Sequence, residues 1–229
     1  MTDDLFADTM IRHQTITRDS VGSLQGSSRH LADCDIEESD LSGFDMSGWT
    51  FERCNLRRTN LSTAVLESTR WLNCRAAFAN FTGAKLNEAV FVASDLNNAS
   101  LRRCALEGAR FERCKLTGAD LSEIKALSVH FEETLLINAK LPGISFRKRT
   151  LRRLDFSQAD LRKCDFRQSV FEECSLREAA LDGSRFDGAD LRGADLGGLR
   201  LQDANRFRGA TISRGQAGQL LGELGLNVV

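Results

Sequence analysis

One apolar position recurs at every fifth residue through most of this 229-residue chain. Between Leu31 and Leu201 this register contains 35 positions, of which twenty are Leu and ten are Phe. The position two residues earlier is Ala, Ser, Thr or Cys in 26 of the 35 quintets, and the remaining positions are mostly polar. A period of five matches neither the 3.6 of a helix nor the 2.0 of a plain strand. It predicts a three-residue strand followed by a corner, with the small residue and the Leu or Phe both pointing inward.

The spacing of the cysteines and aromatic residues predicts how many sides each coil has. All seven cysteines occupy the small position, and they fall into two sets spaced by multiples of 20: Cys34, Cys54, Cys74, Cys114 and Cys174, and Cys104 and Cys164. The same step links Phe51, Phe91, Phe111, Phe131 and Phe171, with Trp71 in the series. We therefore predict four sides and 20 residues per coil, with the cysteines as small apolar fillers rather than metal ligands or disulfides.

The repeat resembles the pentapeptide-repeat family, whose consensus is roughly A(D/N)LXX, as in GADLRGADLGG at 188–198. This resemblance implies an all-β solenoid, a right-handed quadrilateral β-helix of about nine coils, stacked at ~4.8 Å per coil. We expect an N-terminal cap and degenerate repeats over 1–24, the β-helix over 25–212, and a C-terminal helix plus short strand over 213–229. A capping helix is expected within 1–10, and the register slips by one after Leu201, to Phe207 and Ile212.

Bulky side chains replace the small inward residue in two stretches of the repeat. Ile124 and Val129 lie in 122–130, and Ile144, Arg149 and Leu154 lie in 142–154, with the only proline, Pro142. Because such side chains need a wider coil, both stretches are candidate bulges or loops. Their length preserves the five-residue register, so whether either one protrudes stays open.

Composition narrows the classes of function. The chain holds 31 Lys and Arg against 32 Asp and Glu, and 41% of its residues are hydrophobic, which is typical of neither a basic nucleic-acid binder nor a disordered chain. No apolar run approaches ~20 residues, so no membrane span is expected. Seven cysteines without a signal segment indicate a reducing, cytoplasmic location. The three histidines and the cysteine spacings match no metal or catalytic motif, so we expect no enzyme, no cofactor and no metal.

Charge is patterned along the chain even though it nearly cancels in total. Residues 1–50 carry a net charge of −7 and residues 145–170 a net charge of +5. Part of this pattern predicts ladders of alternating sign between coils, such as Glu132, Arg152, Glu172 and Arg192. The ladders leave a candidate basic surface, formed by Arg147, Lys148, Arg149 and Arg167.

The tail QAGQLLGELGLNVV at 216–229 resembles the end of proteins of the Qnr and MfpA type, a topoisomerase-protecting branch of the family. The resemblance implies a homodimer with contacts from Leu220, Leu221, Leu224, Leu226 and Val228. It implies binding to DNA gyrase or topoisomerase IV as a DNA mimic, which protects that enzyme from quinolones or peptide toxins without direct nucleic-acid binding. Candidate phosphate mimics are Asp33, Asp35, Glu37, Glu38 and Asp40. The alternative, a generic protein-interaction scaffold with no topoisomerase role, stays open.

Overall fold

The computed structural model describes residues 10–24, 26–126, 128–199 and 205–228. They form two compact units, Met1–His130 and Phe131–Val229. In both units short parallel strands and bridges pair with residues 20 positions further along the chain. The predicted right-handed quadrilateral β-helix of about nine coils is therefore confirmed.

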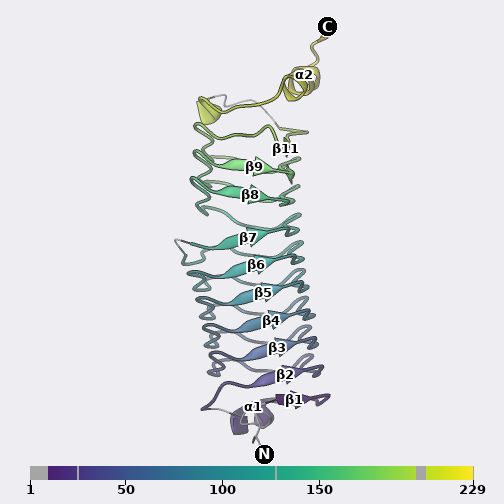
Figure 1. Cartoon of the computed structure of the whole chain (residues 1–229), viewed down its shortest axis with the longest axis vertical. Coiled ribbons are helices and arrows are strands. Elements are labelled where there is room, and N and C mark those ends of the chain that lie inside the picture. Colours follow the sequence, from purple (N-terminus) through teal and green to yellow (C-terminus); the bar gives the residue numbers. More distant parts are fainter. Residues whose placement is uncertain (1–9, 25, 127, 200–204, 229) are drawn as a thin grey trace, which may run out of the picture. The chain divides into compact units, whose positions relative to one another are not determined.

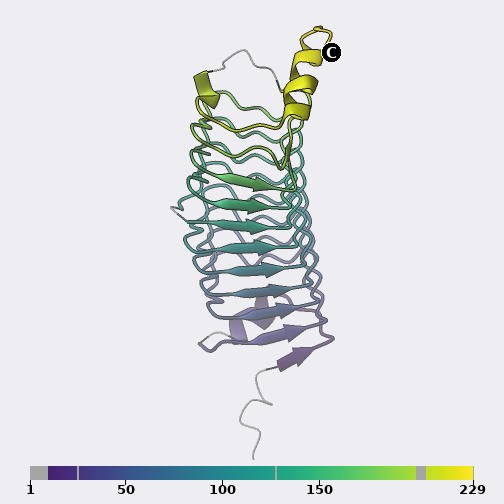
Figure 2. The ribbon, with the colours of Figure 1, turned by 45° about the horizontal axis from the view of Figure 1, so that its top comes forward.

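The first unit is built on one parallel sheet. Its strands are β1 (Met10–Arg12), β2 (His30–Ala32), β3 (Thr50–Glu52), β4 (Arg70–Leu72), β5 (Val90–Val92) and β6 (Arg110–Glu112). They pair in chain order, and each residue faces the one 20 positions on, as Phe51 faces Trp71. Figures 1 and 2 show these strands side by side on one face of the unit. The predicted 20-residue coil is the step between neighbouring strands.

In the four coils that span residues 30–109, the other three sides are held by single bridges. In the first of these coils the bridges join Asp35 to Asn55, Asp40 to Asn60 and Asp45 to Val65. Each side ends at a corner residue with positive φ, such as Asp33 at 54° and Glu38 at 58°. Glycine is the residue that adopts this region without steric cost, which explains Gly43 and Gly48 at the next two corners. The four corners, five residues apart, produce the five-residue period of the sequence.

The interior of the first unit is a column of stacked aromatic and aliphatic side chains. Ring centroids lie 4.2 Å apart between Phe51 and Trp71, 5.3 Å between Trp71 and Phe91, and 4.9 Å between Phe91 and Phe111. All four side chains are fully buried. Because identical inward positions stack directly on one another, each coil is stabilised mainly by its two neighbours.

All seven cysteines are buried in the small inward position, and none forms a disulfide. Their thiols donate to backbone carbonyls of the preceding coil, as from Cys54 to Leu31 at 3.3 Å and from Cys104 to Phe81 at 3.0 Å. This confirms the prediction that they are small interior fillers.

The N-terminal coil contains a helix that the sequence pattern did not predict. Helix α1 (Arg18–Leu24) occupies the position of the degenerate quintets and buries Val21. The side chains of Thr17 and Ser20 bond each other, and each accepts from the other's backbone N–H, which satisfies donors at the helix start. The capping helix expected within 1–10 falls almost wholly on residues 1–9, which lie outside the described residues.

The second unit repeats the same construction. Strand β7 (His130–Glu132) spans the boundary between the units, β8 (Thr150–Arg152) pairs with β9 (Val170–Glu172), and β10 (Cys174–Ser175) pairs with β11 (Ala194–Asp195). Figure 1 shows β8 and β9 stacked like the strands of the first unit. A second aromatic column runs through Phe146, Phe166, Phe186 and Phe207, with centroid spacings of 5.0, 4.8 and 4.9 Å. The last step spans 21 residues, and Asp190 bridges to Thr211, so the predicted slip of one residue is confirmed.

The two stretches with bulky inward residues behave differently. In 122–130, the backbone N–H of Gly108 donates to Ser128, one residue later than the step that joins Glu88 to Glu107. The hydrogen bonding is shifted only locally, because Lys125 and His130 on either side keep the regular 20-residue step. In 142–154 the bridges and β8 keep the regular register, so this candidate bulge or loop does not protrude. Ile144 and Leu154 stay buried because their next-coil neighbours, Cys164 and Cys174, are small.

The C-terminal helix, α2 (Arg214–Glu223), begins with a capping box in which Ser213 and Gln216 satisfy each other's backbone N–H groups. Gln216 also donates to two carbonyls of the last coil of the second unit, at 2.7 Å each. The prediction of a short strand after this helix is wrong for the described residues 226–228, which form no strand. A strand needs a hydrogen-bonding partner, and no bridge joins residues 226–228 to another described residue. Val229 lies outside the described residues.

Candidate protein-interaction surfaces

The acidic residues predicted as phosphate mimics lie on one coil of the first unit, spread over two sides and two corners. Asp33, at a corner, accepts two bonds from the guanidinium of Arg53 in the next coil, both at 2.7 Å. This contact lowers the pKa of Asp33. Arg53 also pairs with Glu52, so it bridges two carboxylates. The charge of Asp33 is therefore balanced within the molecule.

Asp35, Glu37 and Glu38 form a tighter acidic group. The amide of Asn55 donates to both Asp35 and Glu37, at 2.9 Å each. Arg58 lies 3.8 Å from Glu37 and 3.5 Å from Glu38. The structure thus brings these three carboxylates together and covers them with a layer of donors from the next coil.

Asp40 lies on the following side of the same coil. Its carboxylate accepts from the backbone N–H of Ser42 at 3.0 Å and from the amide of Asn60 at 2.9 Å. The hydrogen bonds from Ser42 lower the pKa of Asp40, with Arg18 as a further cause. Asp40 faces a different direction from Asp35 and Glu37, which lie on the preceding side of the coil.

The four predicted basic residues are not equivalent. Arg167 pairs with Asp165 through two bonds, of 2.8 and 2.5 Å, and lowers the pKa of that carboxyl. Arg149 occupies an inward slot and is only half exposed. Arg147 and Lys148 are exposed and have no ion pair with another described residue. The unbalanced positive charge of this candidate surface therefore comes from Arg147 and Lys148.

The residues predicted to form the dimer contact are not equivalent either, because one is buried and four are exposed. Leu220 faces its own unit and is 5% exposed. Four apolar side chains at the C-terminal end remain in solvent: Leu221, Leu224, Leu226 and Val228, at 39%, 61%, 55% and 54%. They lie on and after α2, past the last coil of the second unit (Figure 2).

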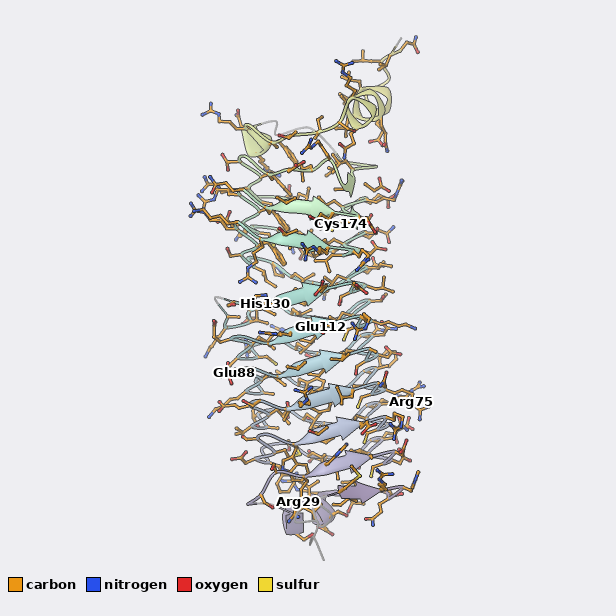
Figure 3. All side chains as sticks on the ribbon, viewed as in Figure 1. Arg29, Arg75, Glu88, Glu112, His130 and Cys174 are labelled. Carbon is orange, nitrogen blue, oxygen red and sulfur yellow. The ribbon has the colours of Figure 1, made fainter. Side chains whose placement is uncertain are left out.

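One further surface, the outer face of the sheet in the first unit, was not predicted from the sequence. Leu72, Val90 and Val92 point outward there and are half-buried between charged neighbours. Figure 3 shows Glu112 over this sheet, whereas Arg75 and Glu88 lie at opposite edges of the unit. Aligning the outward residues of successive 20-residue coils would have revealed the apolar centre.

Among the described residues, no group of three or more His, Cys, Asp or Glu side chains is placed to hold a metal ion. None of the helices in that part of the chain is long and apolar enough to cross a bilayer. Burial raises the pKa of Cys104 and Cys164 to about 12 and that of Cys114 to about 11, which disfavours their nucleophilic thiolate form.

The coil, its inward Leu and Phe and its stacked small residues define a class of protein, the repeat solenoids of five-residue period. A family model described as a pentapeptide repeat region matches residues 66–141. A second model, of nine pentapeptide repeats, matches 150–195, and a third, of eight repeats, matches 30–67 and 130–168. The chain belongs to the pentapeptide-repeat family. Proteins built on this solenoid are generally non-enzymatic scaffolds.

The fold is also similar to solved structures. QnrB1, described as a plasmid-mediated fluoroquinolone resistance protein, matches with a TM-score of 0.56 at 20% identity, over 95% of this chain and 97% of that one. A trypsin-treated form of QnrB1 matches with a TM-score of 0.54 at 21% identity, over 96% and 97% of the two chains. No curated protein matches the sequence.

Proposed function

We propose that this chain is a cytoplasmic binding protein that docks on a type II DNA topoisomerase, DNA gyrase or topoisomerase IV, and protects it from quinolones or peptide toxins. The observation that carries the proposal is the match with QnrB1 over nearly the whole of both chains. The tail sequence, which resembles the same branch of the family, supports it independently.

In this proposal the acidic group of the first unit takes the place of DNA phosphates. Asp35, Glu37 and Glu38 lie on the same coil and share partners on the next one: Asn55 contacts the first two and Arg58 the last two. A topoisomerase surface that normally holds phosphate would therefore meet several carboxylates at once. The binding is stoichiometric and needs no chemical step.

A generic protein-interaction scaffold remains the second candidate, and the charge pairing favours it. Arg53, Arg57 and Arg58 each lie within ion-pair distance of an acidic residue of the preceding coil. Such pairing weakens the negative field that a DNA mimic requires.

A supercoiling assay tests the topoisomerase proposal. Purified protein is titrated into gyrase or topoisomerase IV with and without a quinolone, and we expect recovery of activity in the presence of the drug. The double variant Glu37→Lys/Glu38→Lys should lose this protection. Glu88→Lys is a matched control, because Glu38 and Glu88 both sit at exposed corners with φ of 58°. The proposal is refuted if the protein neither inhibits nor rescues the enzymes at concentrations well above theirs.

We also propose that the chain is a homodimer joined through its C-terminal end. The four exposed side chains Leu221, Leu224, Leu226 and Val228 support this, since a cluster of apolar side chains in water favours burial against a partner. Leu220 instead supports the helix from within its own unit.

A further inference from the structure

The outer face of β3–β6 in the first unit has the composition of a docking site. Two outward columns cross these strands, and neighbouring residues within each column are paired in the sheet. One column reads Thr50, Arg70, Val90, Arg110, and the other reads Glu52, Leu72, Val92, Glu112. Leu72, Val90 and Val92 therefore form a contiguous apolar centre with charged residues on either side along the columns. An apolar centre within a charged rim is the usual anatomy of a protein interface.

Of the four charged residues around this centre, Glu52 pairs with His30 and Arg53, and the other three are available to a partner. Arg70 and Arg110 are exposed, and neither they nor Glu112 form an ion pair with another described residue. Elsewhere in the unit, exposed arginines such as Arg53 and Arg103 pair with acids one coil away. Val90 lies between Arg70 and Arg110, one coil from each of them. Arg70, Arg110 and Glu112 thus border the apolar centre as charges without an ion-pair partner among the described residues.

The face is also open. Parallel sheets usually have both faces covered, and here the inner face packs on the aromatic column. Figures 1 and 2 show no element of the first unit lying over the outer face of β3–β6 among its described residues. A strand of three residues gives a face about 10 Å wide, which matches the diameter of an α-helix.

The spacing of the arginines distinguishes between possible partners. Arg70 and Arg110 lie two coils apart, or about 9.6 Å at 4.8 Å per coil. Residues i and i+7 of an α-helix share a face and are about 10.5 Å apart along its axis. Same-face residues of an extended segment lie at about 6.7 or 13 Å, so they do not match. Nucleic acid offers phosphates but nothing apolar to cover Val90 and Val92.

We propose that the outer face of β3–β6 binds an acidic amphipathic helix of a partner protein, lying across the strands. The helix carries carboxylates at i and i+7 that meet Arg70 and Arg110, apolar residues at i+3 and i+4 that cover Leu72, Val90 and Val92, and a basic residue on its other flank opposite Glu112. This surface is distinct from the acidic group at Asp35 and Glu37, so the inference does not rest on the topoisomerase proposal.

The probe is a fluorescent synthetic helix, stapled on its far face, with Glu at i and i+7 and Leu at i+3 and i+4. Binding to the full chain is measured by fluorescence anisotropy at low and high salt. We expect saturable binding that weakens with salt, and at least a tenfold loss in the double variant Arg70→Glu/Arg110→Glu. That variant should instead prefer a helix with Lys at i and i+7, a gain that misfolding would not produce.

Arg75→Glu is the matched control, because Arg75 is an exposed arginine of the same coil on another side, with no ion pair to a described residue (Figure 3). It should change the affinity less than twofold. The proposal is overturned if the probe does not bind, if Arg75→Glu weakens binding as much as the double variant, or if duplex DNA displaces the helix with equal or higher affinity.

Discussion

At the scale of single residues, the small inward position decides how closely the coils stack. A thiol fits this position and donates to a carbonyl of the preceding coil, whereas its thiolate would be buried without compensation. Burial accordingly raises the pKa of Cys104 and Cys164 to about 12. The cysteines are therefore coupled to stability at high pH.

The direction of this coupling follows from the raised pKa values. The stability is fully present below the ordinary thiol pKa of 9.0 and is lost as the pH rises toward 12, because only the unfolded chain ionises in that window. Each thiol contributes a slope of up to about 1.4 kcal/mol per pH unit. Urea denaturation between pH 7 and 11 should show a smaller decline above pH 9 for Cys104→Ala/Cys164→Ala than for the natural chain. Equal slopes would contradict this assignment.

Trp71 is the largest side chain of the first aromatic column, stacked between Phe51 and Phe91. Its indole N–H donates to Thr69 at 2.9 Å. Trp71→Ala should lower the free energy of unfolding by about 3–5 kcal/mol, because it leaves a cavity between two coils. Trp71→Phe keeps the stack and loses mainly the hydrogen bond, so about 1–2 kcal/mol is expected. Denaturation followed by circular dichroism compares them, and equal losses would show that stacking is not the main contribution.

At the scale of elements, helix α2 has two different roles on its two faces. Gln216 and Leu220 attach it to its own unit, while Leu221 and Leu224 are exposed. Leu221→Asp/Leu224→Asp should therefore convert the proposed dimer into a monomer without unfolding the chain, as measured by light scattering. Arg214→Asp, an exposed change on the same helix, should keep the mass of a dimer. A natural chain that is already monomeric would refute the dimer.

The elements also show where prediction from sequence succeeds. The helix at 214–223 was predictable, because Ser213, Gln216 and the leucine spacing act locally. Helix α1 was not, since its quintet spacing at Ile16 and Val21 imitates the repeat while Thr17 and Ser20 cap a helix. The regular register of 142–154 was not predictable from its own quintets, because it depends on small residues 20 positions further along the chain.

At the scale of the whole molecule, the coil and its interior were predictable because one register runs through both units. The candidate surfaces were less predictable, because ion pairs within and between coils determine which charges remain unpaired. Arg167 is paired, whereas Arg147 in the preceding coil has no ion pair with a described residue. The apolar centre on β4 and β5 becomes visible only when outward residues are compared coil by coil.

This pairing yields a test of DNA mimicry. Arg53→Gln/Arg57→Gln/Arg58→Gln removes three positive charges from the acidic group while leaving hydrogen-bonding side chains. If carboxylates replace phosphate, the triple variant should act on gyrase at a several-fold lower concentration in the supercoiling assay. Arg102→Gln/Arg103→Gln, which unpairs Glu123 instead, is the control and should leave that concentration unchanged. An unchanged or higher effective concentration for the triple variant would favour the scaffold function.

The ladder of residues 20 positions apart has a consequence for how such a chain can evolve. Inserting or deleting one residue within a side would turn every later inward side chain toward solvent until a bulge or corner absorbed it. The 21-residue step from Asp190 to Thr211 shows that a single addition is absorbed late in the second unit, after most of its repeats. Duplication of a whole 20-residue coil changes no register at all. Gene duplication in units of 60 nucleotides is therefore the mutational route by which this protein can lengthen and gain a new binding face.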